Sequence, residues 1–318
     1  MADTQNIPIP VMNSKILESL DRDNVKTAQD ASTDYTRIQI REESFAFKVQ
    51  VPEKATDDML DRALDERLQI IWEKEPDSPA AKWVPLQTVP DGEYITGSRY
   101  IIPFARVVTP KFVKDIDELR TTRQDIRKIM TDNSIKDALA EIDSKWINTV
   151  NSIVEDCDEP GAPNNITGKV QLQSFTDGLT PQSFAEAKKM LPRGNAQGKF
   201  RARNYICLMN DVTAQDWLKL KYTDIGDQAT EFFKNGLTTD TFQGIKAIFT
   251  IKADLVPDNY VYFFAAPEFL GKCFYLTDWT MYMKKEAYFI EMFSYWLGGF
   301  AFGNLAGMAL AKFNQSAS

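Results

Sequence analysis

The longest helical pattern in this sequence is residues 109–154, TPKFVKDIDELRTTRQDIRKIMTDNSIKDALAEIDSKWINTVNSIV. Thr109 can cap a helix and Pro110 suits the first helical position, so this pair predicts a helix start. Apolar residues then recur at helical spacing, interrupted only at residues 131–134: Phe112, Ile116, Leu119, Ile126, Ile129, Met130, Ile135, Leu139, Ile142, Trp146, Val150 and Val154. A helix of about 45 residues would measure roughly 65 Å, which predicts a rod. Residues 157–164, with two prolines and a glycine, should end it.

Two strands are expected before this rod. Phe45, Phe47, Val49 and Val51 alternate with other residues, which predicts a strand over residues 45–51 that ends at Pro52. Residues 100–108 predict a second strand, and Pro103 places it at a sheet edge or a bulge. We expect the two strands to pair as a long hairpin.

The segment between these strands should be an excursion from the body. Thr56 is expected to cap a helix over residues 57–72, whose apolar residues recur at three- and four-residue steps. Residues 76–110 contain six of the 15 prolines, so they cannot form one continuous helix. We therefore predict an extended excursion with a helical insertion, and this hairpin has no evident core of its own.

A mixed region of helices and strands is expected after the rod. The predicted helices begin at Thr180-Pro181, at Thr213 with Asp216 ahead of residues 217–220, and near Phe232-Phe233. The predicted strands are residues 205–209, 245–251, 260–264, 273–276 and 279–283.

Residues 292–311 contain no charged side chain and place Gly299, Gly303 and Gly307 at four-residue spacing. Such a run is long enough for a membrane-spanning helix with a glycine packing face. However, the pair Gly298-Gly299 is unfavourable in the middle of a helix, and only Lys312 follows as a charged flank. We expect buried strands here, with a membrane anchor as the alternative.

The composition excludes several kinds of chemistry. The 318 residues include 45 acidic and 37 basic side chains but no histidine, so histidine relays and histidine metal ligands are unavailable. Residues 199–318 hold 12 basic and 12 acidic residues, so the net charge of −8 belongs to residues 1–198. Neither part offers the net basic surface that tight binding of nucleic acid requires.

The cysteines and the N-terminal residues both indicate a cytoplasmic protein. Cys157, Cys207 and Cys273 are odd in number and widely spaced, which fits neither a disulfide framework nor a zinc site. We expect them to be buried thiols. Asp3 and the polar residues 4–6 do not resemble a signal peptide.

One loop partly matches a phosphate-binding motif. In residues 194–200, GNAQGKF, only three residues separate the glycines, and Phe200 stands where the motif needs Ser or Thr. We expect a polar loop. Lys199, Arg201 and Arg203 would form a basic strip on an extended segment, which is more typical of a solvated face than of a contact surface.

The many carboxylates leave acid–base chemistry open without pointing to a site. Asp115, Asp117 and Glu118 should form ion pairs with Lys114 or Arg120 on a polar helix face. No local motif singles out a catalytic pair of carboxylates. We therefore assign no catalytic, cofactor-binding or metal-binding residue.

The order of these parts resembles the major capsid protein of tailed bacteriophages, whose fold is shared with encapsulins and herpesvirus capsids. Several short stretches are also similar to phage coat proteins: TPKF with KD within residues 109–115, LMN at 208–210, FQGI at 242–245 and VPDN at 256–259. The resemblance covers most of residues 35–313. It implies an α+β fold with an N-arm, an E-loop, a P-domain containing a long spine helix, and an A-domain.

On this resemblance, residues 1–34 would be the N-arm and residues 35–110 the E-loop with its helical insertion. Residues 111–167 and 286–318 would form the P-domain, and residues 168–285 the A-domain. The resemblance implies a protein of the virion, assembled in the cytoplasm of a bacterial host, without catalysis, cofactor or membrane partner. Its partners would be copies of itself in pentamers and hexamers, scaffold, portal and cement proteins, and packaged DNA through non-specific contacts.

A physical argument supports this interpretation independently. A hairpin without its own core must bury its apolar face elsewhere, and a neighbouring subunit is the natural partner. Two alternatives stay open: a carboxylate-dependent hydrolase, and a protein anchored to a membrane by residues 292–311.

Overall fold

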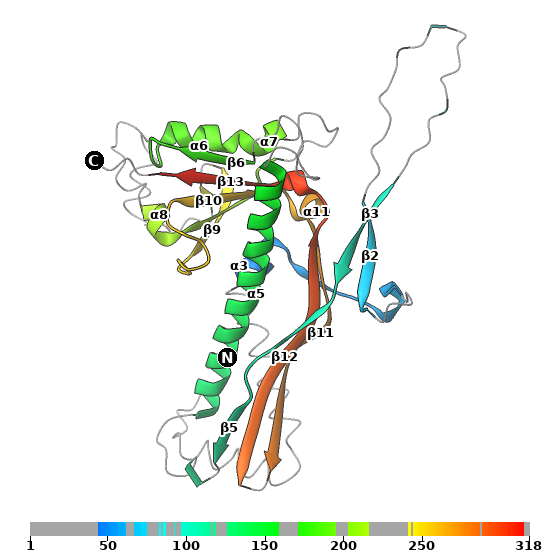
Figure 1. Cartoon of the computed structure of the whole chain (residues 1–318), viewed down its shortest axis with the longest axis vertical. Helices are drawn as coiled ribbons and strands as arrows, with labels where there is room; N and C mark the ends of the chain where they lie inside the picture. The colour runs from blue at the N-terminus through cyan, green and yellow to red at the C-terminus, as the bar shows by residue number, and fades with distance from the viewer. Residues whose placement is uncertain are drawn as a thin grey trace, which may run out of the picture.

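The computed structural model describes residues 44–61, 67–74, 97–115, 117–118, 126–158, 171–194, 203–215, 241–242, 244–286 and 288–314, with the single residues Trp83, Pro85, Leu86 and Gly92. They form two β-sheets, a two-stranded hairpin, a long helix and several short helices. Figure 1 shows the long helix α5 (Ile126–Asp158) running from one sheet down beside the long strands of the other. The described body is therefore elongated and mixes helix with sheet, as predicted.

Helix α5 is shorter than the predicted rod. Its 33 residues span about 50 Å, against the roughly 65 Å expected. The helix continues through residues 131–134, where the apolar stripe is interrupted, and Thr131 and Ser134 are buried there. It ends at Asp158, within the predicted stop. Much of the predicted apolar stripe is confirmed as core: Ile135, Leu139, Ile142, Trp146, Val150 and Val154.

The predicted helix start at Thr109-Pro110 is also wrong. Residues Phe112–Asp115 form strand β5, which pairs antiparallel with β12 (Phe289–Phe302). The Thr109 hydroxyl accepts the N–H of Ser294 at 2.9 Å and donates to its carbonyl at 3.3 Å. A sheet partner distant in sequence thus satisfies the groups that the local pattern assigned to a helix.

The five-stranded sheet is built on a long ribbon of two strands. Its order is β1 (Pro52–Lys54), β11 (Gly271–Glu286), β12 and β4 (Ala105–Val108), with β5 also paired to β12. Register shifts interrupt β11 between Tyr275 and Thr280. These irregularities coincide with the gap predicted between strands 273–276 and 279–283, which are in fact parts of one strand.

The six-stranded sheet contains the other predicted strands. Its order is β6 (Leu172–Phe175), β13 (Met308–Phe313), β10 (Tyr260–Phe264), β7 (Ile206–Asn210), β9 (Ile245–Thr250) and β8 (Thr241–Phe242). The expected strands at 205–209, 245–251 and 260–264 are confirmed. One apolar core lies between this sheet and helices α6 (Pro181–Lys188) and α7 (Met190–Gly194).

The short helices beside this sheet follow the predictions only in part. Helix α6 begins after Thr180, as expected, and Thr180 and Ser183 form a capping box there. Thr213 instead lies inside α8 (Asp211–Gln215), where its hydroxyl accepts the N–H of Asn259 at 2.7 Å. The expected helices at residues 217–220 and 232–233 lie outside the described residues. A further short helix, α11 (Pro267–Leu270), precedes β11.

The first predicted strand is a single helical turn, α3 (Phe45–Val49). Phe45, Ala46, Phe47 and Val49 are all buried, whereas a strand would have turned Ala46 to the opposite face from its neighbours. The Ser44 hydroxyl caps this turn by accepting the N–H of Phe47 at 3.3 Å. The strand predicted from the alternating pattern is therefore wrong. The apolar residues of α3 are all buried because α5 and both sheets enclose it.

The hairpin exists, but between other partners. Strand β2 (Gln69–Lys74) pairs antiparallel with β3 (Ser98–Pro103), so residues 45–51 are not its first arm. Among the described residues of 57–72, the expected helix is reduced to the 3-10 turn η1 (Asp57–Met59), and the Thr56 side chain makes no capping bond. Ile70, Ile71 and Trp72 favour a strand because β-branched and aromatic residues fit a pleated surface. Pro103 terminates β3, which fits its predicted edge position.

Residues 292–311 are strands, as expected, and not one continuous helix. They cover most of β12, the 3-10 turn η3 (Leu305–Gly307) and the start of β13. Among the described helices, none combines the length and apolar character that crossing a bilayer requires.

Candidate assembly surfaces

The root of the hairpin is fixed by its inner face. Ile70 and Ile102 face each other across β2 and β3 and pack with Ala55 and Phe274 in a small apolar core. The Trp72 ring lies 5.3 Å from that of Phe274. Through these contacts the five-stranded sheet holds one side of the hairpin.

Two glycines let the hairpin approach β12 closely. A Cβ atom at Gly299 would lie 2.1 Å from the carbonyl oxygen of Pro103, at the end of β3. A Cβ at Gly303 would lie 2.6 Å from the Tyr100 ring. Two of the three regularly spaced glycines that suggested a membrane helix therefore form the seat of the hairpin.

The outer face of the hairpin is partly apolar and open to solvent. Ile71 and Ile101 form a cross-strand pair, with exposed fractions of 39% and 54%. Beside them, the Arg99 guanidinium lies 2.8 Å from the Glu73 carboxylate in an exposed ion pair. We call these four residues the outer hairpin face. It is an apolar pair bordered by charges, without a covering element among the described residues.

A second open surface lies on the five-stranded sheet. Along β12, Ile290, Met292, Ser294 and Trp296 are buried and alternate with less buried residues on the other side. We call that other side the open sheet face; its apolar members are Val108, Val113, Tyr282, Phe289, Phe293 and Tyr295.

Aromatic contacts order this open sheet face. The rings of Tyr282 and Phe293 are 5.0 Å apart, and those of Phe293 and Tyr295 are 6.3 Å apart. Lys111 and Glu291 form an ion pair at 2.6 Å beside them. Aromatic residues with polar neighbours are typical of surfaces that bind another protein.

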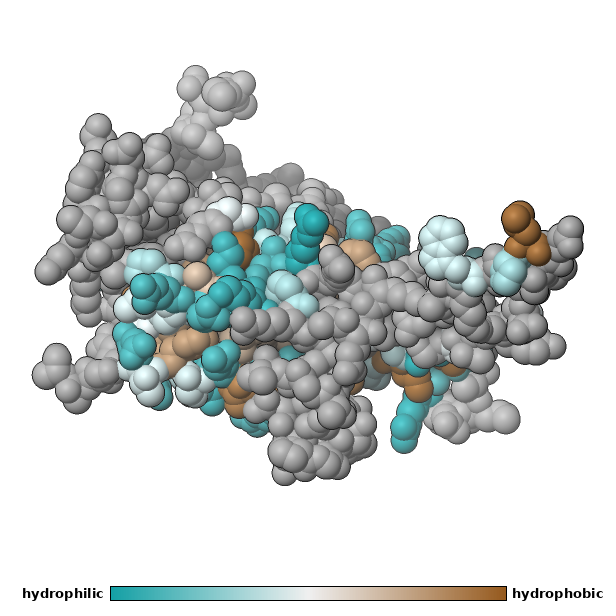
Figure 2. All heavy atoms as spheres, turned by 90° about the horizontal axis from the view of Figure 1, so that it is seen from above, coloured by the Kyte–Doolittle hydropathy of each residue, from teal (hydrophilic) through white to brown (hydrophobic). Residues whose placement is uncertain are grey.

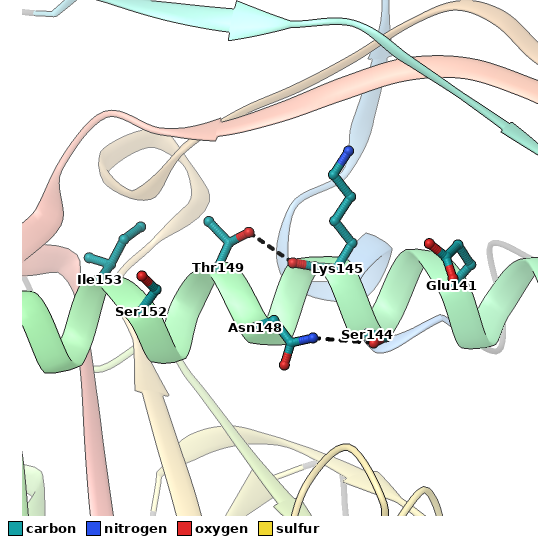
Figure 3. Close-up of a pocket in the computed structure, with 7 residues that line it drawn as sticks. All are labelled: Glu141, Ser144, Lys145, Asn148, Thr149, Ser152 and Ile153. Atoms are coloured by element: carbon teal, nitrogen blue, oxygen red, sulfur yellow. Dashed lines mark hydrogen bonds between the residues drawn. The ribbon is translucent and has the colours of Figure 1, made fainter.

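The exposed side of α5 is hydrophilic. Figure 3 shows an open hollow lined by Glu141, Ser144, Lys145, Asn148, Thr149, Ser152 and Ile153, all from this helix. Thr149 Oγ1 donates to the carbonyl oxygen of Lys145 at 2.8 Å, which is a local helix contact. Glu141 is the single carboxylate among the lining residues, so this hollow does not bring together an acid–base pair.

The surface seen from above is mixed. In Figure 2 most coloured atoms are hydrophilic or intermediate, with apolar atoms in separate patches. The two apolar surfaces defined above thus belong to a body that also carries many polar side chains.

The structure tests only some of the candidate motifs. Residues 195–202, which contain most of the glycine loop and the basic strip, lie outside the described residues. Lys114 forms the expected ion pair with Glu118, while the Asp115 carboxylate accepts the N–H of Asp117 at 2.7 Å. Arg120 lies outside the described residues. The sequence pattern did not indicate the roles of Gly299 and Gly303, because their close contacts involve a strand almost 200 residues earlier in the chain.

Cys207 and Cys273 are buried free thiols, and burial raises the pKa of each to about 12. With Cys157→Ser removing the third thiol, we expect the native protein to resist a thiol reagent at about pH 8 and to react fully once unfolded. Unfolded thiols ionise near pH 8.5, whereas these folded thiols stay protonated. The free energy of unfolding should therefore fall as pH rises from about 9 toward 12, as measured by denaturant titration. Rapid labelling of the native variant would contradict this burial.

Solved structures share this architecture. The mature capsid of bacteriophage PhiM1 matches with a TM-score of 0.56 at 10% identity, covering 85% of this chain and 87% of that chain. The capsid of cyanophage P-SCSP1u matches with a TM-score of 0.54 at 9% identity, covering 78% and 84%. The capsid of an empty GTA particle matches with a TM-score of 0.54 at 12% identity, covering 84% and 88%. No protein-family model and no curated protein matches the sequence. Across most of its length, this chain has the fold of the major capsid proteins of bacteriophages.

Proposed function

We propose that this chain is a major capsid protein that self-assembles into the icosahedral shell enclosing phage DNA. The observation that carries this proposal is the extent of the fold likeness, which includes 85% of this chain and 87% of a phage capsid chain. A structural role also fits the composition, because a chain without histidine lacks the commonest general base. We therefore propose that the protein acts through shape and contact, without catalysis or a cofactor.

The two open apolar surfaces support contacts between copies. An apolar face that stays solvated in one chain gains stability when a second chain covers it, by about 25 cal/mol per Å² of apolar surface. The outer hairpin face lies on a two-stranded projection, and the open sheet face lies on the body. We propose that both are covered by neighbouring copies within pentamers and hexamers.

The domain division stays part of this proposal. Residues 1–34 would form the N-arm, residues 35–110 the E-loop, residues 111–167 and 286–318 the P-domain, and residues 168–285 the A-domain. Three strand pairs cross the boundary at 285/286: β11 with β12, β13 with β10, and β13 with β6. We propose that β11 belongs functionally with the P-domain and β13 with the A-domain.

The remaining partners follow from the same proposal. The protein would be part of the virion and would assemble in the bacterial cytoplasm, with scaffold, portal and cement proteins as its further partners. A chain with net charge −8 should contact packaged DNA only non-specifically, because it offers no excess of basic residues to neutralise phosphates.

Sedimentation of the purified full chain, alone and coexpressed with its neighbouring genes, tests the proposal. We expect rapidly sedimenting assemblies at high protein concentration, with their proportion depending on concentration because association follows mass action. A chain that stays monomeric across protein and salt concentrations in both preparations would overturn the proposal.

Ile101→Asp should reduce assembly without unfolding the chain. The new carboxylate would lie in the outer hairpin face, where covering it by a second copy would require desolvating a charge. Because Ile101 is exposed in the single chain, we expect its free energy of unfolding to change by less than about 0.5 kcal/mol. Sedimentation and denaturant titration measure the two effects separately.

Ile251→Asp is the matched control. Ile251 is 82% exposed directly after β9, outside both defined surfaces. Assembly equal in the two variants would show that the outer hairpin face makes no specific contribution.

A further inference from the structure

One carboxylate of α5 lies inside the molecule. Asp143 is fully buried, and its Oδ2 atom lies 2.6 Å from the ammonium group of Lys252. Its Oδ1 atom accepts from the Ser44 hydroxyl at 2.6 Å and from the N–H of Ala46 at 3.3 Å. The partners come from segments 97 to 109 residues distant in sequence, so this one carboxylate joins three parts of the chain.

These contacts converge on α3, the turn that follows residues 1–43. The Lys252 ammonium lies 5.7 Å from the centre of the Phe45 ring. Phe45 in turn packs on Trp146 with ring centres 6.0 Å apart, and Phe47 packs on Trp296 at 5.8 Å. Helix α3 thus fills the space between α5 and the five-stranded sheet.

The backbone of α3 gives it little support of its own. A helix of five residues is too short to be stable by itself, because the cost of starting a helix is not recovered in a single turn. On its C-terminal side, among the described residues, only the three-residue strand β1 connects it to β11 by a ladder. Side-chain contacts and the Asp143 cluster must therefore hold it in place.

We propose that Asp143, Lys252 and Ser44 form a latch, and that α3 opens and closes on α5 as a unit while both sheets stay folded. Opening would separate Phe45 and Phe47 from Trp146 and Trp296. Closing fixes the point at which residues 1–43 join the body. The link to assembly rests on the proposed function. Copies assemble only when the latch is closed, because the start of the N-terminal arm then has one defined position.

The latch has a specific energetic signature. Asp143 is fully buried, whereas the Lys252 side chain is 27% exposed, so removing Lys252 leaves an uncompensated buried carboxylate. Opening α3 returns that group to water, so loss of the latch should favour the open form. Each sheet also has apolar contacts apart from α3, the six-stranded sheet with α6 and α7 and the five-stranded sheet with the hairpin, so both can stay folded when α3 opens.

Hydrogen exchange of the full chain below its assembly concentration tests this directly. In α3, the Lys48 N–H bonds to the Ser44 carbonyl at 3.2 Å and the Gln50 N–H to the Ala46 carbonyl at 2.8 Å, so both report closure. We expect Lys252→Met to accelerate exchange at these amides by about 100-fold and Asp143→Asn to accelerate it by a smaller factor, with the amides of β10 unchanged. Ser44→Ala removes one latch contact and the helix cap, so it should act in the same direction and more weakly.

Asp137→Asn is the matched control, because Asp137 is an exposed acid on the same helix. Unchanged exchange at Lys48 and Gln50 in the latch variants would overturn the proposal. Loss of exchange protection in β10 at the same time would also overturn the proposal, because α3 would then unfold together with the rest of the protein. If Asp143→Asn does not fold, Ser44→Ala gives the same readout.

Particle formation tests the second half of the proposal. We expect latch variants that open α3 to assemble at least tenfold less than the Asp137→Asn control. Normal assembly with an open latch would refute the link to assembly. A wild-type chain that never assembles would instead refute the proposed function and leave the exchange result standing.

Discussion

Gly299→Ala is expected to abolish correct assembly, because it prevents the hairpin from seating on β12. The added Cβ atom would lie 2.1 Å from the Pro103 carbonyl oxygen and 2.9 Å from its carbonyl carbon. Both are backbone atoms, so a change of side-chain rotamer cannot relieve the clash and strand β3 must move. We expect a loss of about 1–3 kcal/mol in the free energy of unfolding and almost no regular particles. Denaturant titration and sedimentation measure the two effects.

Gly307→Ala is the control for this substitution. Its Cβ would meet its nearest neighbour, the Ala265 Cβ, at 3.5 Å, which is an ordinary contact. Gly303→Ala should reduce assembly by an intermediate amount, because its Cβ would meet the Tyr100 ring, which is a side chain and not backbone. Shortening that side chain by Tyr100→Ala should partly restore the assembly of Gly303→Ala. Particles from Gly299→Ala that match those from Gly307→Ala would contradict the proposed seat.

Trp146→Ala is expected to have the largest effect on folding. The Trp146 ring lies 6.0 Å from Phe45 of α3, 5.2 Å from Phe264 of β10 and 5.8 Å from Phe302 of β12. One side chain on α5 therefore packs with α3 and with both sheets. Replacing a buried tryptophan by alanine costs about 3–5 kcal/mol, a large part of the total stability of an ordinary domain. Thermal and denaturant unfolding should both show the loss.

Trp83→Ala is the matched control, because the Trp83 side chain is fully exposed. It should leave the free energy of unfolding within about 0.5 kcal/mol of wild type. Trp146→Phe keeps part of the ring contact, so its free energy of unfolding should lie between those of Trp146→Ala and Trp83→Ala. Equal stability of Trp146→Ala and Trp83→Ala would show that the cluster around Trp146 does not hold the parts together.

The sequence predicted elements best where each was decided by its own residues. Strand β10 and helix α6 are examples, because a continuous apolar run and a Thr-Pro cap are local signals. Predictions failed where a distant partner decided the structure. Residues 112–115 carry a helical pattern but pair with β12, and residues 45–49 alternate like a strand but form a turn enclosed on several sides.

The candidate surfaces were even harder to predict from the sequence, because they too depend on partners that are distant in the chain. The sequence indicated a hairpin with little core, which is correct, but placed its first arm at residues 45–51 and its helix where β2 lies. The residues along β12 alternate between two faces of the strand, but the strand pairing must be known before one face can be identified as buried and the other as open. Asp143 reads as an ordinary acid on a helix, since its partners Ser44 and Lys252 are brought to it by the tertiary fold.

Electron microscopy of the full chain, purified alone and together with its neighbouring gene products, tests whether copies of the chain assemble into a shell. We expect closed shells of uniform diameter, with subunits clustered around fivefold and sixfold positions. In those shells, the outer hairpin face and the open sheet face should both be covered by neighbouring copies. Isolated single particles in every preparation, at all protein and salt concentrations, would contradict it.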